Sequence, residues 1–136
     1  MRSIVLDNEA VQALTDPRNP KHRAVVAHLA GATARRRRGR VVEAVVPTAV
    51  RVEAAWDRTA ASAAAINRFP VRDHALDAPA ADVAAQIQRA TSTGVADAHI
   101  GATVRSLPST EVVVLTSDPA DIAAVCSPAP VTIVNV

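Results

Sequence analysis

Two acidic residues, Asp7 and Asp118, each follow a short apolar run of the kind that forms a buried strand. The runs are residues 4–6 and residues 112–117. Open α/β sheets bind their ligands at the carboxyl ends of parallel strands. Two strands that end in this way therefore predict two carboxylates in one crevice.

Two further acids suit the same edge. Glu53 is expected one to two turns into a helix that follows the second strand, and Asp97 in the first turn of a helix after Gly94. Carboxylates that converge repel one another unless a cation neutralises them. Mg²⁺ or Mn²⁺ suits an all-carboxylate set, whereas four scattered His and the single Cys126 offer no zinc site.

Each of these acids also has a purely structural interpretation. Asp7 and Asp118 are both suitable helix N-caps, and Asp118 is followed by Pro119 and Asp121 in the favoured positions. Asp97 complements a helix dipole in a first turn, and Glu53 is explained as an exposed helix residue. These interpretations account for the acids singly and leave their joint arrangement unexplained.

The elements that must position the acids alternate between strand and helix along the chain. Strands are expected at 3–6, 41–46, 67–72, 111–116 and 131–135. Helices are expected at 8–15, about 20–34, about 48–60, about 77–90 and 95–106, with a short one opened by Asp118 and Pro119. In the helix after Pro47, we place Val52, Ala55 and Trp56 on one face. This alternation predicts one α/β domain, residues 1–136, with a mainly parallel sheet.

Composition sets the remaining limits. A chain of 136 residues with 49% hydrophobic residues suits one core, but its only aromatic residues are Trp56 and Phe69. An Ala- and Val-rich core buries little area per residue, so we expect stability to depend partly on a partner or a dimer. The single Cys excludes an internal disulfide, and there is no signal-like or membrane-spanning apolar run, so we expect a cytoplasmic protein.

The cations are concentrated in one segment. Fourteen of the fifteen are Arg, and five of these are Arg35, Arg36, Arg37, Arg38 and Arg40. Arg suits bidentate contact with phosphate, so this Arg run is a candidate contact for an RNA or DNA backbone. A solvated, mobile loop explains the run equally well.

Four short motifs resemble those of the PIN-domain family and, within it, the VapC-type toxins of bacterial toxin–antitoxin pairs. They are IVLDNEA (4–10), PTAVRVE (47–53), ADAHIGA (96–102) and LTSDPAD (115–121). Each motif is weak alone, but the four occur in order, with family-like spacing, over almost the whole chain. The resemblance implies a three-layer α/β/α PIN-like fold.

The resemblance also implies a function and a site. Asp7, Glu53, Asp97 and Asp118 would be an acidic quartet that binds Mg²⁺ or Mn²⁺, with Asp121 a less favoured substitute for Asp118. The reaction would be hydrolysis of RNA that leaves a 5′-phosphate and a 3′-hydroxyl, with one or two metal ions. A cognate antitoxin would hold the enzyme inactive, and a homodimer is expected.

Departures from the family pattern leave other possibilities. Glu9 introduces a fifth acid near the first Asp, and His99 lies two residues after Asp97, where we expect a surface or packing role. The Arg run is longer than usual for the family. Receiver-domain, P-loop and haloacid-dehalogenase-like functions lack their required Lys, Gly-rich turn and second Asp respectively. The serious alternative is a catalytically weak PIN-like module that binds another protein.

Overall fold

The computed structural model describes residues 1–39 and 41–136, and the side chains of residues 32–37 are not among the parts described. The strands are β1 (Arg2–Leu6), β2 (Val42–Pro47), β3 (Val71–His74), β4 (Glu111–Thr116) and β5 (Thr132–Asn135). The α-helices are α1 (Asn8–Thr15), α2 (His22–Arg37), α3 (Thr48–Glu53), α4 (Ala78–Thr91), α5 (Val95–Ser106) and α6 (Pro119–Cys126). Two short 3₁₀ turns, η1 (Ala61–Ala63) and η2 (Ile66–Arg68), precede β3.

The five strands form one parallel sheet in the order β3-β2-β1-β4-β5. Strand β1 is central and pairs with β2 on one side and β4 on the other; Leu6 lies opposite Leu115. From β1 the chain adds β2 and β3 on one side and then crosses to add β4 and β5 on the other. This switch point beside β1 creates the crevice in which α/β folds bind ligands. The predicted α/β class is confirmed.

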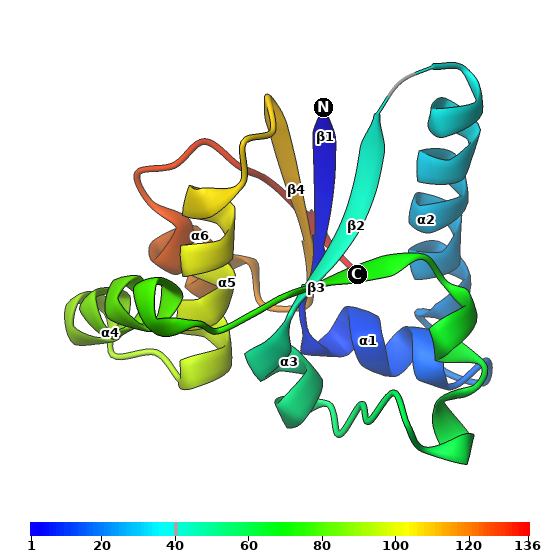
Figure 1. Ribbon diagram of the computed structural model, residues 1–136, viewed down its shortest axis with the longest axis horizontal. Helices are drawn as coiled ribbons and strands as arrows, with labels where there is room; N and C mark the ends of the chain where they lie inside the picture. Colours follow the sequence, from blue (N-terminus) through cyan, green and yellow to red (C-terminus); the bar gives the residue numbers. More distant parts are fainter. Residues whose placement is uncertain (40) are drawn as a thin grey trace.

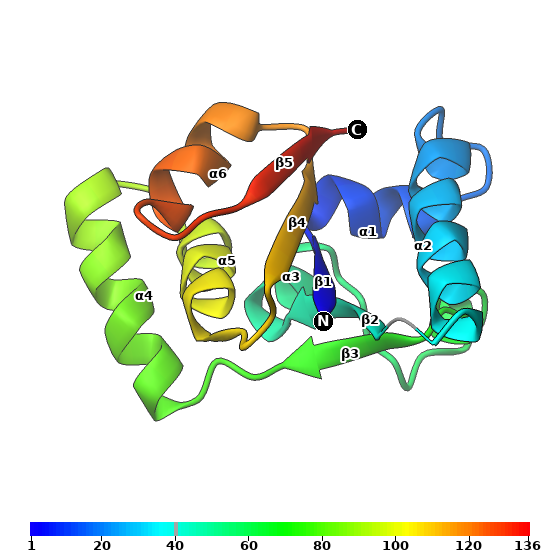
Figure 2. The same cartoon turned by 90° about the horizontal axis from the view of Figure 1, so that it is seen from above.

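Helices cover both faces of the sheet. Helices α4, α5 and α6 lie on one side, and α1 and α2 on the other (Figures 1 and 2), which gives three layers, α/β/α. In Figure 1 the amino end of β1 is at the top, and α1 and α3 begin at the opposite edge, where β1 and β2 end. Among the residues that the structure describes, no helix is long and apolar enough to cross a membrane.

The layers pack closely because many of the contacting residues are small. Helix α5 is buried on nearly all sides, from Ala96 and Ala98 to Val104. At Gly101, an added Cβ would clash with the backbone carbonyl of Val125 in α6 and lie 3.0 Å from Ile87 Cδ1 in α4. The Ala-rich sequence therefore compensates for its small side chains by bringing helices close together.

The expected helix at 48–60 is wrong beyond its first part. Helix α3 ends at Glu53, and Ala55 takes a left-handed conformation with φ of 54°. The chain turns here so that Trp56 becomes buried, only 5% exposed, and its indole Nε1 donates to Asn67 Oδ1 at 3.0 Å. Burial of the one large indole thus outweighs the helical propensity of the Ala-rich segment that follows.

Other boundaries differ by a few residues. Strand β3 occupies 71–74 rather than 67–72, because Pro70 has no N–H for a ladder and residues 66–68 form η2 instead. Strand β2 includes Pro47 as its last residue. Helix α2 continues to Arg37 rather than ending near 34, so the backbone of Arg35–Arg37 is helical and not a loop.

Candidate active site at the carboxyl edge of the sheet

Asp7 is the most rigidly held of the four predicted acids. It immediately follows β1, is 6% exposed, and caps α1 by accepting a hydrogen bond on Oδ1 from the Asn8 N–H at 2.5 Å. Its Oδ2 accepts a bond from the Thr116 hydroxyl, also at 2.5 Å. Both carboxylate oxygens are therefore fixed in place, at the amino end of a helix that favours their negative charge.

Thr116 links the two strand ends. Its hydroxyl donates to Asp7 and accepts from the Asp118 N–H at 3.0 Å. Asp7 N–H donates to the Leu115 carbonyl at 3.1 Å, which continues the β1–β4 pairing up to the acid. Sequence reasoning missed Thr116; its position two residues before Asp118, at the end of an apolar strand, was the available signal.

Asp118 and Asp121 lie at the start of α6. Asp118 is an exposed N-cap whose Oδ1 accepts from the Asp121 N–H at 3.5 Å, as predicted. The pKa of Asp121 is raised, because of its side-chain hydrogen bond with Asp118 and then the negative charge of Asp118. The negative charge of Asp118 therefore acts directly on its neighbour in the first turn of α6.

Asp97 reveals the electrostatic character of this edge. It is half-buried in the first turn of α5, and its pKa is raised to about 6. Burial is the largest cause, and the negative charges of Asp7, Glu53, Asp121 and Asp118 follow in that order. The side chains predicted to form one site, together with Asp121, therefore act on Asp97 from several elements at once.

Glu53 is the last residue of α3 and is exposed. Its pKa is raised by partial burial and then by the charge of Asp7. Its helix position agrees with the prediction, although the helix ends there. Glu53, like Asp118, is exposed and has room to reorient.

The donor set fits a hard divalent cation in its chemistry. All the donors are carboxylate oxygens, and burial, followed by the negative charges of neighbouring acids, raises the pKa of Glu53 and of Asp97. Within residues 1–39 and 41–136, however, no three His, Cys, Asp or Glu side chains lie close enough to hold one ion as they stand. Binding a metal would require the exposed carboxylates to turn inward toward Asp7 and Asp97.

Glu9 and His99 have other partners. Glu9 Oε2 forms an ion pair with Lys21 Nζ at 3.3 Å. His99 is fully buried and accepts a hydrogen bond on Nδ1 from the Ala49 N–H at 3.3 Å, and burial, then the charge of His74, lowers its pKa to about 4. His99 therefore packs as a neutral core residue, one of the two roles expected for it.

Two arginines, Arg51 in the last turn of α3 and Arg58 beyond it, converge on one carboxylate. Arg51 Nε and Arg58 Nη2 both pair with Asp73 Oδ1, at 3.0 and 2.8 Å, and both guanidinium groups contact the Trp56 ring, at 5.8 and 4.2 Å from its centroid. Two guanidinium groups thus share one carboxylate and stack on one indole ring. The predicted Arg run lies largely outside the described residues: the side chains of Arg35, Arg36 and Arg37 and the whole of Arg40 are not described, and Arg38 is exposed.

An apolar groove adjoins the acids. Val52 and Val95 are 81% and 56% exposed. They line the groove together with Thr48, Ala49, Glu53, Leu76 and Ala96. Large exposed apolar side chains side by side are typical of surfaces that bind a protein.

Fold and site together define a three-layer α/β protein with an acidic carboxyl edge. The chain matches no protein-family model, no curated protein and no solved structure. Membership of the PIN-domain family therefore stays a prediction that rests on the four motifs.

Proposed function

We propose that this protein is a metal-dependent endoribonuclease of the VapC type, with Asp7, Glu53, Asp97 and Asp118 as its acidic quartet. The observation that carries the proposal is the half-buried position of Asp97 among the other acids: burial, and then the negative charges of Asp7, Glu53, Asp121 and Asp118, raise its pKa. Structural roles as helix caps do not require four acids from four separated segments to influence one another. A site that binds a divalent cation does require it.

The residues of the quartet would divide the work. Asp7, fixed by Thr116 and Asn8, is the rigid anchor. Asp97 and Asp118 would complete the ligand set from the starts of α5 and α6, and Glu53, exposed on α3, would be either a further ligand or the group that orients the attacking water. Bound Mg²⁺ or Mn²⁺ would lower the pKa of that water and stabilise charge on the phosphate and the leaving oxygen.

RNA would be held mainly through its backbone. Trp56 is buried and the chain has only one other aromatic residue, so few aromatic rings are available to stack on RNA bases. The Arg run, at the end of α2 and beyond, is the proposed phosphate contact. Binding should therefore weaken steeply as salt is raised, and a flat salt dependence would exclude this contact.

The protein partners of the proposal are a cognate antitoxin and a second copy of the chain. Exposed Val52 and Val95 beside the acids supply apolar surface for such a partner. A basic side chain from the antitoxin, placed among the carboxylates, would compete with the metal. This mode of inhibition would use the same crowded negative charge that the metal uses.

The first experiment is cleavage of total RNA and of a tRNA pool by the purified chain with Mg²⁺ or Mn²⁺. Asp7→Asn and Asp97→Asn should abolish cleavage, as should chelation, whereas Asp82→Asn, which changes an exposed acid on α4, should leave it intact. Mg²⁺ or Mn²⁺ should also raise the melting temperature of the wild type, since a ligand at 100 times its Kd adds about 2.7 kcal/mol to the free energy of unfolding. Asp97→Asn should reduce that rise, and Asp82→Asn should not.

The same apolar groove favours a second candidate function, a PIN-like module that binds a protein with little turnover. The RNA cleavage experiment described above distinguishes this binding module from the nuclease. If both RNA preparations stay intact with metal present, antitoxin absent and the fold confirmed, the binding module replaces the nuclease as the proposed function.

A further inference from the structure

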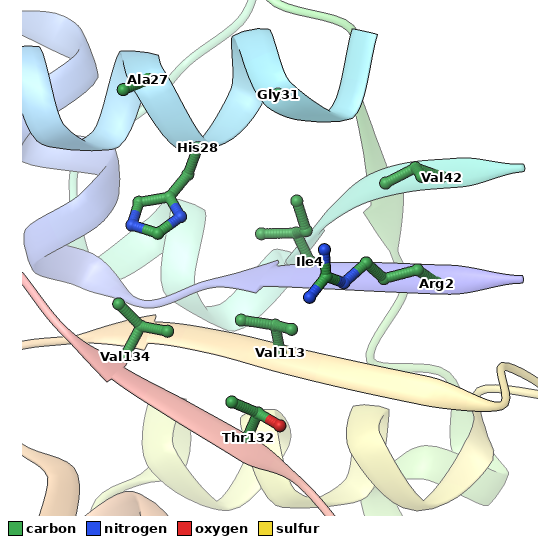
Figure 3. A pocket seen from close by; sticks show the side chains of 9 residues that line it. All are labelled: Arg2, Ile4, Ala27, His28, Gly31, Val42, Val113, Thr132 and Val134. Carbon is green, nitrogen blue, oxygen red and sulfur yellow. The ribbon is translucent and has the colours of Figure 1, made fainter. Parts of the chain in front are cut away.

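A pocket of about 190 Å³ lies between α2 and the sheet, on the face opposite α4, α5 and α6 (Figure 3). It is lined by Arg2, Ile4, Ala27, His28, Gly31, Val42, Val113, Thr132 and Val134. Three of these, Arg2, Val42 and Thr132, are the first residues of their strands. The pocket therefore begins at the amino ends of the strands, whereas the acidic quartet lies beyond the carboxyl ends.

Arg2 gives the pocket an unused hydrogen-bond donor. Its Nη2 pairs with Glu111 Oε1 at 2.7 Å, but its Nε is buried and has no hydrogen-bond partner among the described residues. A buried N–H without a partner costs free energy, which an anionic oxygen beside the guanidinium would recover. In Figure 3 the guanidinium group extends over Ile4 into the pocket.

The other lining groups indicate the chemistry of the rest of the ligand. The half-buried His28 points its ring from α2 toward the sheet, and Thr132 contributes a hydroxyl from β5. The floor between them is aliphatic, formed by Ile4, Val113 and Val134. No acidic residue is among the described lining groups, and Glu111, which pairs with Arg2 Nη2, lies outside the lining.

We propose that this pocket binds a short, branched aliphatic carboxylate. The carboxylate would accept from Arg2 Nε, with His28 and Thr132 beside it, and the alkyl chain would lie on Ile4, Val113 and Val134. Inorganic phosphate fits poorly, since the aliphatic floor would desolvate its charged oxygens without offering donors. The pocket is smaller than sites for drug-sized ligands, which limits the acid to about six carbons. This inference is independent of the proposed nuclease activity.

The test is a calorimetric titration of the full chain with 4-methylpentanoate, followed in parallel by the ring resonances of His28. Saturable binding that shifts His28 is expected. The uncharged 4-methylpentanamide and inorganic phosphate should both bind at least tenfold more weakly. Equal affinity for the amide or for phosphate, or no binding of the acid, would overturn the proposal.

Variants locate the site. Arg2→Gln and Gly31→Leu should each weaken binding at least tenfold; a Cβ at Gly31 has no neighbour within 4 Å, so the new side chain begins without a clash. Glu111→Gln should keep or increase affinity, since it removes only the competing carboxylate, and Arg89→Gln on α4 should change nothing. Unchanged affinity in both Arg2→Gln and Gly31→Leu would refute the assignment.

A final titration separates two sources of the same chemistry. An acetylated tripeptide that ends in leucine carries the same branched alkyl group and carboxylate as the free acid. If it displaces 4-methylpentanoate and binds at least tenfold more tightly, the natural ligand is a peptide C-terminus. Weaker binding of the peptide supports the free acid.

Discussion

The Thr116 hydroxyl donates to Asp7 Oδ2 at 2.5 Å and joins the ends of β4 and β1 by a side-chain bond. The two residues are 109 positions apart in the chain. The same hydroxyl accepts from the Asp118 N–H, so one Thr fixes the orientation of one predicted ligand and the backbone of another. Groups that hold metal ligands in place commonly affect metal affinity and activity nearly as much as the ligands themselves.

Thr116→Val keeps the shape of the side chain but removes both hydrogen bonds. We expect the free energy of unfolding to fall by about 2 kcal/mol, because the nearly buried Asp7 carboxylate loses a donor. We also expect RNA cleavage to fall by about 10- to 100-fold, because Asp7 is less firmly oriented. Thr116→Ser retains the hydroxyl and is the control, with a smaller loss in both measurements, urea unfolding and initial cleavage rate. Equal stability of the Val variant and the wild type would contradict the role assigned to this bond.

Asp97 should make the protein less stable as pH rises. Its pKa is about 6 in the folded state against an ordinary value of 3.8, so between these two pH values the folded chain holds a proton that the unfolded chain has lost. The free energy of unfolding therefore falls as pH increases through this window, and the loss is complete above about pH 6. Because Asp97 is only half-buried, solvent screening reduces the contribution to about 1 kcal/mol.

Unfolding of the metal-free chain between pH 4 and 7 measures this effect. Asp97→Asn should flatten that part of the profile and be the more stable protein at pH 7, while Asp82→Asn should reproduce the wild-type slope. An unchanged pH profile in the Asp97→Asn variant would show that neither burial nor the neighbouring carboxylates raise the pKa of Asp97.

Gly101 sets the distance between α5 and α6. Gly101→Ala should lower the free energy of unfolding by about 1–3 kcal/mol, because the new Cβ meets the Val125 carbonyl and the α6 backbone must move. Gly31→Ala, in α2 beside the pocket, has no such neighbour and should be neutral or stabilise by up to about 1 kcal/mol through helix propensity. Thermal unfolding of the two variants makes the comparison, and a neutral Gly101→Ala would indicate that the helices are less tightly packed.

Val52 should belong to a surface that a second copy covers. If it does, the melting temperature of the wild type rises with chain concentration, since each tenfold increase adds up to about 1.4 kcal/mol to the stability of a dimer. Val52→Lys should remove this dependence. Val41→Lys, at another exposed valine outside the groove, should keep it. A wild-type melting temperature that does not change with concentration would argue against the dimer.

Local patterns alone determined much of the secondary structure. The predicted helices at 8–15 and 95–106 and the strand at 111–116 have the bounds observed. Their signals are short-range: an N-cap at Asp7, a Gly before α5, and a β-branched run in β4. Alternation of such elements was sufficient to predict a parallel sheet, because parallel strands need a crossover between them.

Only the tertiary structure decided the path from Glu53 to β3. Trp56 is buried by contacts with Arg58 and Asn67, which lie further along the chain, and no local pattern encodes these contacts. The predicted helix failed for this reason, since the burial of one indole group outweighs the small helix propensities of its neighbours.

In the candidate site, too, some features follow from the local sequence and others only from the tertiary structure. The sequence by itself determined which acids follow which elements, because cap residues and strand ends have local signatures. It did not determine that Thr116 would hold Asp7, how strongly the other acids would act on Asp97, or that Arg2 and His28 would share a pocket. Those relationships depend on distances and burial between segments far apart in the chain, which arise only when the sheet and its helices pack together.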